Sequence, residues 1–172
     1  MNDVEIDAPA APATTVCPGC GAVLAVVPGL SADHPGASPS CAALFGVTVR
    51  GLRDEAGQDP RSTALLQLAT DAYDAQHLVE GGATDPVVRL CLELERGVDP
   101  VRARELTARA AGTSPHHLTR PVRWTSTLAD IAADLDVVDL TALVRSWAGA
   151  VWADWGPAAG PVREAADRVL TS

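Results

Sequence analysis

Two of the four cysteines lie three positions apart, in the stretch CPGCG at residues 17–21. Zinc in proteins prefers four ligands at tetrahedral corners, taken mainly from thiolates and imidazoles, and two cysteines at this spacing can bind one ion together. The glycine after the second cysteine permits the tight backbone turn that this geometry requires. The pattern continues as C-x2-C-x13-H-x6-C. It predicts a local, closed zinc site formed by Cys17, Cys20, His34 and Cys41.

A second histidine is an alternative fourth ligand. His77 ends the stretch DAYDAQH and would tie the cysteine segment to a helix that lies well downstream. Thioredoxin-like redox chemistry is the other interpretation of CPGCG, but redox pairs of this spacing occur at a strand-to-helix turn in a βαβ unit, which the sequence lacks. The remaining cysteine, Cys91, lies on the apolar stripe of a predicted helix, and we expect it to be a small buried hydrophobic residue.

The stretch around His77 also has the residue types of a catalytic site. Asp71, Tyr73, Asp74 and His77 fall within two helical turns. A carboxylate beside an imidazole fixes its tautomer and raises its basicity, which suits a general base or a metal ligand. His116, in an irregular segment, could join them. The alternative is that His77 only caps the carbonyl groups at the end of its own helix.

The elements that must position these residues are mostly helices. Apolar residues at spacings of three and four, with Asp-Pro starts and glycine stops, predict seven helices. They cover residues 41–56, 61–80, 87–97, 99–112, 125–136, 139–157 and 161–170. The apolar run at residues 22–27 is a candidate short strand. We therefore expect an all-α fold, a bundle of about six or seven helices with an N-terminal zinc knuckle.

The chain divides into a leader and one domain. Residues 1–15 have few bulky apolar side chains and are predicted to be a disordered leader. Residues 16–172 then form a single zinc-binding helical domain, with a metal knuckle at 16–41 and the helical bundle at 42–170. Within the bundle, a helical stripe carries Trp147, Trp152 and Trp155. It is expected to be core rather than a pocket or interface, with Trp155 partly exposed at the helix end.

Charge and hydropathy exclude several classes of partner. The formal net charge is −9, and all 13 basic residues are arginines without a basic run. Such a chain is unsuited to contacts with nucleic-acid phosphates or an anionic membrane surface. No apolar stretch approaches the length of a membrane span. The acidic opening lacks a signal-peptide pattern, so a cytoplasmic location is expected.

Several motifs together resemble a bacterial family of unknown function. They are CPGCG, HPGASPSC, DAYDAQH, LCLELERG and WAGAVWADW, spread over about residues 16–168. The resemblance implies the fold and a metal, and no reaction. The family tends to have histidine at the positions of Gln67 and Pro86, and proline at that of Leu78. A second histidine site in the bundle would therefore be depleted in this chain.

Two functional hypotheses follow. In the first, the chain is a binding or accessory protein with a structural Cys3His zinc site, and it recognises an unknown protein or small molecule in a groove between helices. In the second, it is a zinc-dependent enzyme in a small-molecule biosynthetic pathway. There Cys17, Cys20 and Cys41 leave an open coordination position, and His77 with Asp74 or Tyr73 moves protons. The number of protein ligands distinguishes the two hypotheses, since a closed site of four is structural.

Overall fold

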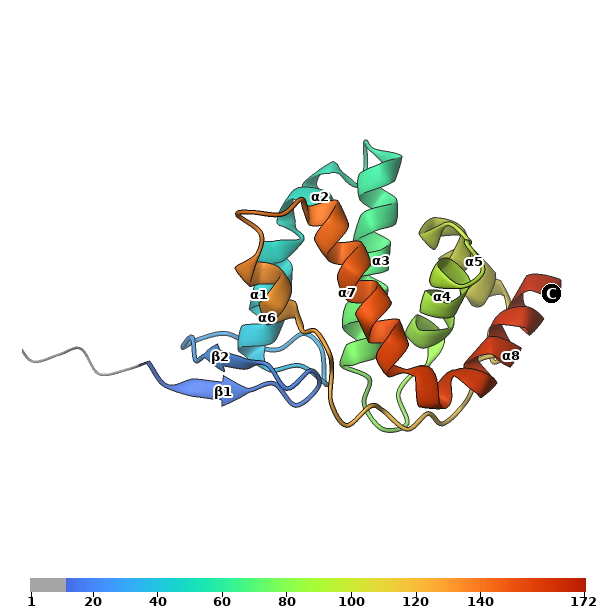
Figure 1. Cartoon of the computed structure of the whole chain (residues 1–172), viewed down its shortest axis with the longest axis horizontal. Helices are drawn as coiled ribbons and strands as arrows, with labels where there is room; N and C mark the ends of the chain where they lie inside the picture. The colour runs from blue at the N-terminus through green and yellow to red at the C-terminus, as the bar shows by residue number, and fades with distance from the viewer. Residues whose placement is uncertain (1–11) are drawn as a thin grey trace, which may run out of the picture.

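The fold is a helical bundle with a small β-hairpin at one end (Figure 1). The computed structural model describes residues 12–172. Within that range there are eight α-helices and a two-stranded sheet. The prediction of a mainly helical fold is confirmed. The leader predicted at residues 1–15 lies largely outside the described residues, and its last two positions belong to the hairpin.

The hairpin consists of β1 (Thr14–Val16) and β2 (Val23–Ala25), which pair in antiparallel fashion. Thr15 lies opposite Leu24 in this register. The CPGCG stretch forms the connection between the two strands. Each strand is only three residues long, so the hairpin has too few ladder bonds to be stable alone.

The helix predicted at residues 41–56 is divided in two. Helix α1 spans Pro39–Thr48, and α2 spans Arg50–Glu55. Ser38 starts α1 by accepting a hydrogen bond from the amide of Cys41, which places that cysteine in the first helical turn. The chain leaves helical geometry at Val49 in a stretch where β-branched residues lower the helix propensity.

Three of the longer helices begin in the same way, with an aspartate cap. Helix α3 (Pro60–Gln76) follows Asp59, α5 (Pro100–Arg109) follows Asp99, and α7 (Leu140–Asp154) follows Asp139. Each aspartate accepts hydrogen bonds from backbone amides of the first turn, which have no partner within the helix.

The other helices depart slightly from the predicted boundaries. Helix α4 (Asp85–Leu94) includes Asp85 as its first residue rather than as its cap. Helix α6 (Leu128–Ala133) is a short helix that starts with a capping box. In this motif the side chains of Thr127 and Asp130 each accept a hydrogen bond from the backbone amide of the other residue. After α7 the chain makes one 3₁₀ turn, η1 (Gly156–Ala158), and ends in α8 (Ala159–Thr171).

Helix α3 lies at the centre of the bundle, and α7, α4, α2 and α5 pack around it. Helix α8 packs on the far side of α4, while α1 contacts β2 and α6 (Figure 1). The core is largely aliphatic and contains two completely shielded tryptophans, Trp147 and Trp155. The expectation that Trp155 is partly exposed is wrong. Trp124 packs edge-on against the Trp155 ring, with the two ring centres 6.1 Å apart.

Candidate metal centre

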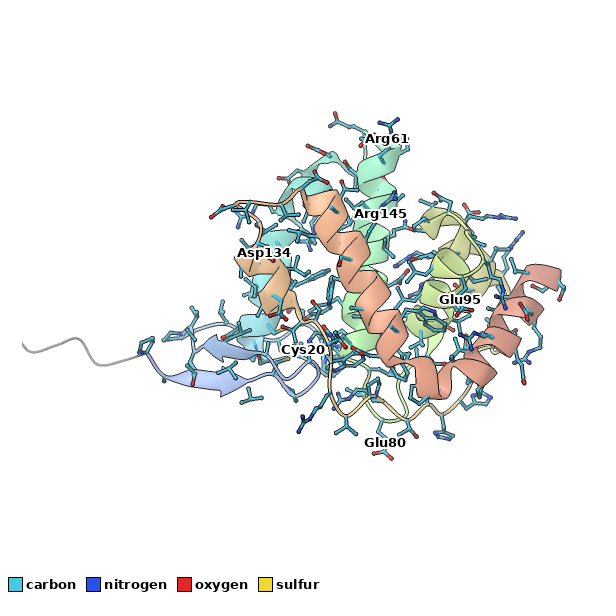
Figure 2. All side chains as sticks on the ribbon, in the orientation of Figure 1. Cys20, Arg61, Glu80, Glu95, Asp134 and Arg145 are labelled. Carbon is cyan, nitrogen blue, oxygen red and sulfur yellow. The ribbon has the colours of Figure 1, made fainter. Side chains whose placement is uncertain are left out.

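Three cysteines and one histidine from distant parts of the chain meet beneath the hairpin. They are Cys17, Cys20, Cys41 and His77, and we call them the Cys3His cluster. Their sulfur and nitrogen atoms all lie within 4.8 Å of one another, and all four side chains are buried. Cys20 lies near one end of α3, where the hairpin connection meets the bundle (Figure 2). Thiolates and imidazole at such separations can hold a metal ion.

The backbone around CPGCG is a tight turn that directs both cysteines inward. The amide of Gly21 donates to the carbonyl of Cys17, and the amide of Cys17 donates to the carbonyl of Ala22, each at 2.9 Å. Gly21 has a φ of 77°, a conformation that favours glycine. The amide of Ser38, which lies outside this turn, donates a hydrogen bond to the sulfur of Cys17 at 3.4 Å.

His77 has one ring nitrogen fixed and the other directed at the cysteines. It is the residue that ends α3. Its Nδ1 lies 2.7 Å from the carbonyl oxygen of Tyr73, and because a carbonyl can only accept, Nδ1 carries the proton. Nε2 lies 3.4 Å from the sulfur of Cys41. A backbone carbonyl that holds the second nitrogen in this way is the usual support of a metal-binding histidine.

Two glycines allow the cysteine segment to approach His77 closely. A Cβ atom at Gly19 would overlap the His77 ring, and one at Gly36 would overlap the His77 carbonyl oxygen. On the outer side, the indole N–H of Trp124 donates to the carbonyl of Gly19 at 2.9 Å. The sequence alone does not reveal the roles of Gly19, Gly36 and Trp124. The glycines in CPGCG and HPG were visible signals, but their contact with His77 depends on the tertiary fold.

The cluster shifts the proton affinities of its own members. Hydrogen bonds with Cys20 and Cys41 hold the pKa of Cys17 far below that of a free thiol, whereas hydrogen bonds with Cys17 and Cys20 raise the pKa of Cys41. Burial lowers the pKa of His77, but hydrogen bonds with Cys17 and Cys20 outweigh it and raise this pKa to about 9. The arrangement favours negative charge on the sulfur of Cys17, the form that binds metal ions.

His34, the predicted fourth ligand, lies beside the cluster rather than in it. The centre of its ring is 5.8 Å from that of His77. Its Nδ1 accepts a hydrogen bond from the amide of Gly36 at 3.1 Å, and its Nε2 faces Asp74 at 3.8 Å. Residue spacing within the segment 17–41 alone favours His34. The fold brings the end of α3 to the cysteines, so the alternative, His77, occupies that position.

Of the candidate catalytic residues, Tyr73 and His77 are in contact, whereas His116 lies apart from them. Asp74 is partly buried, and this burial, followed by the nearby carboxylate of Asp71, raises its pKa to about 6. Tyr73 stacks on Phe45 with ring centres 4.2 Å apart and forms an apolar wall beside His77. His116 is exposed and lies outside the group around the cysteines.

Asp71 has a different role, which the sequence did not reveal. Its side chain is completely buried, and one carboxylate oxygen accepts from Arg89 at 2.7 Å and from Arg104 at 3.0 Å. These two arginines belong to α4 and α5, so a single carboxylate joins three helices. Cys91 is buried as predicted, and burial raises its pKa to about 11.

Comparison with known proteins identifies the family. The sequence model of DUF5946, a family of unknown function, matches residues 15–156. The match covers most of the chain, and the chain therefore belongs to this family. All four members of the Cys3His cluster lie in the matched range. Neither the comparison with curated proteins nor that with solved structures found a match. Among residues 12–172, no helix is long and apolar enough to cross a membrane.

Proposed function

We propose that this chain binds zinc and serves as a binding or accessory protein. A structural zinc ion attaches the cysteine segment to the helical bundle. The ligands are Cys17, Cys20, Cys41 and His77. The observation that carries the proposal is the separation of the ligand atoms. For tetrahedral zinc with bonds of about 2.3 Å to sulfur and 2.0 Å to nitrogen, adjacent sulfurs are about 3.8 Å apart, and sulfur and nitrogen are about 3.5 Å apart.

Two separations within the cluster agree with these values. The sulfurs of Cys20 and Cys41 are 3.8 Å apart, and Cys41 sulfur is 3.4 Å from Nε2 of His77. Three sulfurs and one imidazole are also the ligand types that favour zinc over magnesium or calcium, which prefer oxygen.

Burial of the ligands supports a structural rather than a catalytic ion. Cys17, Cys20, Cys41 and His77 are between 0 and 3% exposed. A catalytic zinc site keeps one coordination position for water or substrate, whereas four buried protein ligands fill the tetrahedron. His77 as a ligand is also not available as a general base. These features favour the accessory-protein hypothesis over the enzyme hypothesis.

A structural ion would hold the cysteine segment in place against the bundle. The cysteine segment is rich in proline and glycine, its hairpin is short, and Val16 and Val23 on that hairpin are mainly exposed. Such a segment buries too little apolar surface to hold its own position. Zinc would join it to the first turn of α1 and to His77, which follows the last residue of α3, so the binding energy of the metal contributes to folding.

The test is the zinc content of protein purified without added metal, measured by elemental analysis. We expect one zinc per chain in the wild type. His77→Ala and Cys41→Ser should lose it. His34→Ala and Cys91→Ala are matched controls, since each removes a residue of the same type outside the cluster, and both should retain the metal. Loss of zinc with His34→Ala and retention with His77→Ala would contradict the proposed ligand set.

A further inference from the structure

Two buried carboxyl groups, Asp71 of α3 and Glu93 of α4, meet inside the bundle. Asp71 is completely shielded from solvent, and both carboxyl oxygens of Glu93 are shielded as well. The two side chains are hydrogen-bonded to each other. An ionised carboxylate can only accept a hydrogen bond, so one of the two groups must carry a proton.

The two neighbouring arginines determine which group carries it. Oδ1 of Asp71 accepts from Arg89 at 2.7 Å and from Arg104 at 3.0 Å. Oδ2 of Asp71 and both oxygens of Glu93 receive no N–H or O–H group from any other residue among residues 12–172. Because the guanidinium groups stabilise the ionised form of the carboxyl group that they contact, Asp71 is the carboxylate and Glu93 is the acid. The proton of Glu93 then satisfies Oδ2 of Asp71.

The charges around the pair also favour a single proton. Arg89 and Arg104 face both carboxyl groups, and Asp74, one turn further along α3, lies near the same arginines. With Glu93 neutral, the carboxylates of Asp71 and Asp74 balance the two guanidinium groups. Ionisation of Glu93 would add a buried negative charge that has no counter-ion. Burial, and then the charge of Asp71, accordingly raise the pKa of Glu93 to about 9.

The other helices that pack against α4 do not supply a cation for this charge. The charged residues that α8 presents to α4, Arg163 and Asp167, are bound to residues 95–96. On α7, Arg145 borders the same groove as Glu93, but it does not hydrogen-bond to either carboxyl oxygen. Within residues 12–172, the proton is therefore what stabilises Glu93 in its buried position.

We propose that Asp71 and Glu93 share one proton, and that this shared proton makes the contact between α3 and α4 a pH-sensitive switch. An unfolded glutamate ionises near pH 4.3, whereas Glu93 in the folded chain keeps its proton to a much higher pH. Between these two pH values the folded state binds one more proton than the unfolded state, so stability falls as the pH rises. The switch does not depend on the zinc proposal, since neither residue belongs to the Cys3His cluster.

The test is urea unfolding of the zinc-loaded full chain at pH 6, 7 and 8, with wild type and Glu93→Gln compared at each pH. Glutamine has the size of the protonated acid, and its amide can donate to Asp71 at every pH. One bound proton changes the unfolding equilibrium constant about tenfold per pH unit. The ratio of the unfolding constants of wild type and Glu93→Gln should therefore rise about 100-fold from pH 6 to pH 8. The zinc ligands titrate equally in both proteins and cancel in this ratio.

Glu164→Gln is the matched control, because it makes the same change at an exposed position of α8 and should show no such rise. A ratio for Glu93→Gln that does not change with pH would overturn the proposal. If Glu93→Gln does not fold, NMR of the carboxyl carbon of Glu93 in the wild-type protein gives the answer. This carbon should show the protonated acid at pH 7, and its ionisation near pH 4.3, as in a free glutamate, would equally overturn the proposal.

Discussion

At the scale of single residues, the metal centre depends on groups that are not ligands. The carbonyl of Tyr73 orients the ring of His77, and Gly19 and Gly36 allow the cysteine segment to lie against that histidine. Neither glycine has a positive φ, in contrast to Gly21. Glycine is therefore needed at these two positions because there is no space for a side chain, and not because of the backbone conformation. A substitution to alanine, which adds one methyl group, tests this.

We predict that Gly36→Ala lowers stability by about 1–3 kcal/mol, the usual cost of inserting a group into a filled space. The added Cβ would meet the backbone carbonyl of His77, which no side-chain rotation can move away. Gly149→Ala is the control, since it lies within α7 with open space around it and should be neutral or stabilising by up to about 1 kcal/mol. Urea unfolding of both variants measures the difference, and equal stabilities would refute the close packing.

At the scale of secondary-structure elements, two carboxylates join helices that are distant in sequence. Asp71 of α3 is buried and binds one arginine of α4 and one of α5. Glu95, just after α4, binds Arg163 of α8 at 2.6 Å and the indole N–H of Trp152 of α7 at 3.1 Å. The first connection lies inside the bundle and the second near its surface, so they should respond differently to mutation and pH.

Asp71→Asn should reduce the free energy of unfolding by about 3–5 kcal/mol, because it leaves the largely buried Arg89 without its counter-ion. Glu105→Gln breaks an exposed ion pair with Arg102 and should cost at most about 1 kcal/mol. Chemical denaturation of the two variants beside the wild type gives the comparison. Similar small losses for both would mean that Asp71 does not hold the three helices together.

The connection through Glu95 should weaken in acid. The hydrogen bonds from Arg163 lower the pKa of Glu95 to about 2, whereas an unfolded glutamate has a pKa of about 4.3. A lowered folded-state pKa stabilises the protein above the unfolded pKa, and this advantage is lost as the pH falls from about 4.5 to about 2. The stability difference between wild type and Glu95→Gln should therefore shrink over that interval in urea titrations. Loss of metal in acid affects both proteins equally, and a pH-independent difference would contradict this assignment.

At the scale of the whole molecule, sequence periodicity and helix caps predicted most of the fold. The stops and starts around Asp59, Asp99 and Asp139 are local signals, so the helices that follow them were found close to their observed boundaries. The burial of Trp155 was missed because the packing of other elements decides it, and the break at Val49 because weak helix propensity alone does not show where a helix ends. The three cysteines were identified from spacing. His77 was only an alternative to His34, since no local pattern reveals that the end of α3 packs against the cysteine turn.

Metal removal should release one part of the molecule and leave the rest intact. The hairpin and the loop that leads to α1 are attached through the Cys3His cluster, whereas α4 and α8 pack against each other away from it. After treatment with a strong chelator, hydrogen exchange should increase in residues 14–38 and remain slow in α4 and α8. Uniform loss of protection would mean that the metal supports the whole bundle, and no change would mean that it is not structural.

The most direct test of the central claim is the zinc coordination shell measured by X-ray absorption on the wild-type protein. Coordination by Cys17, Cys20, Cys41 and His77 predicts three sulfur atoms at about 2.3 Å and one nitrogen at about 2.0 Å, with no water. His34→Ala should give the same spectrum. A shell with two or fewer sulfurs, with a bound water, or with a nitrogen that disappears in His34→Ala would contradict the closed Cys3His centre.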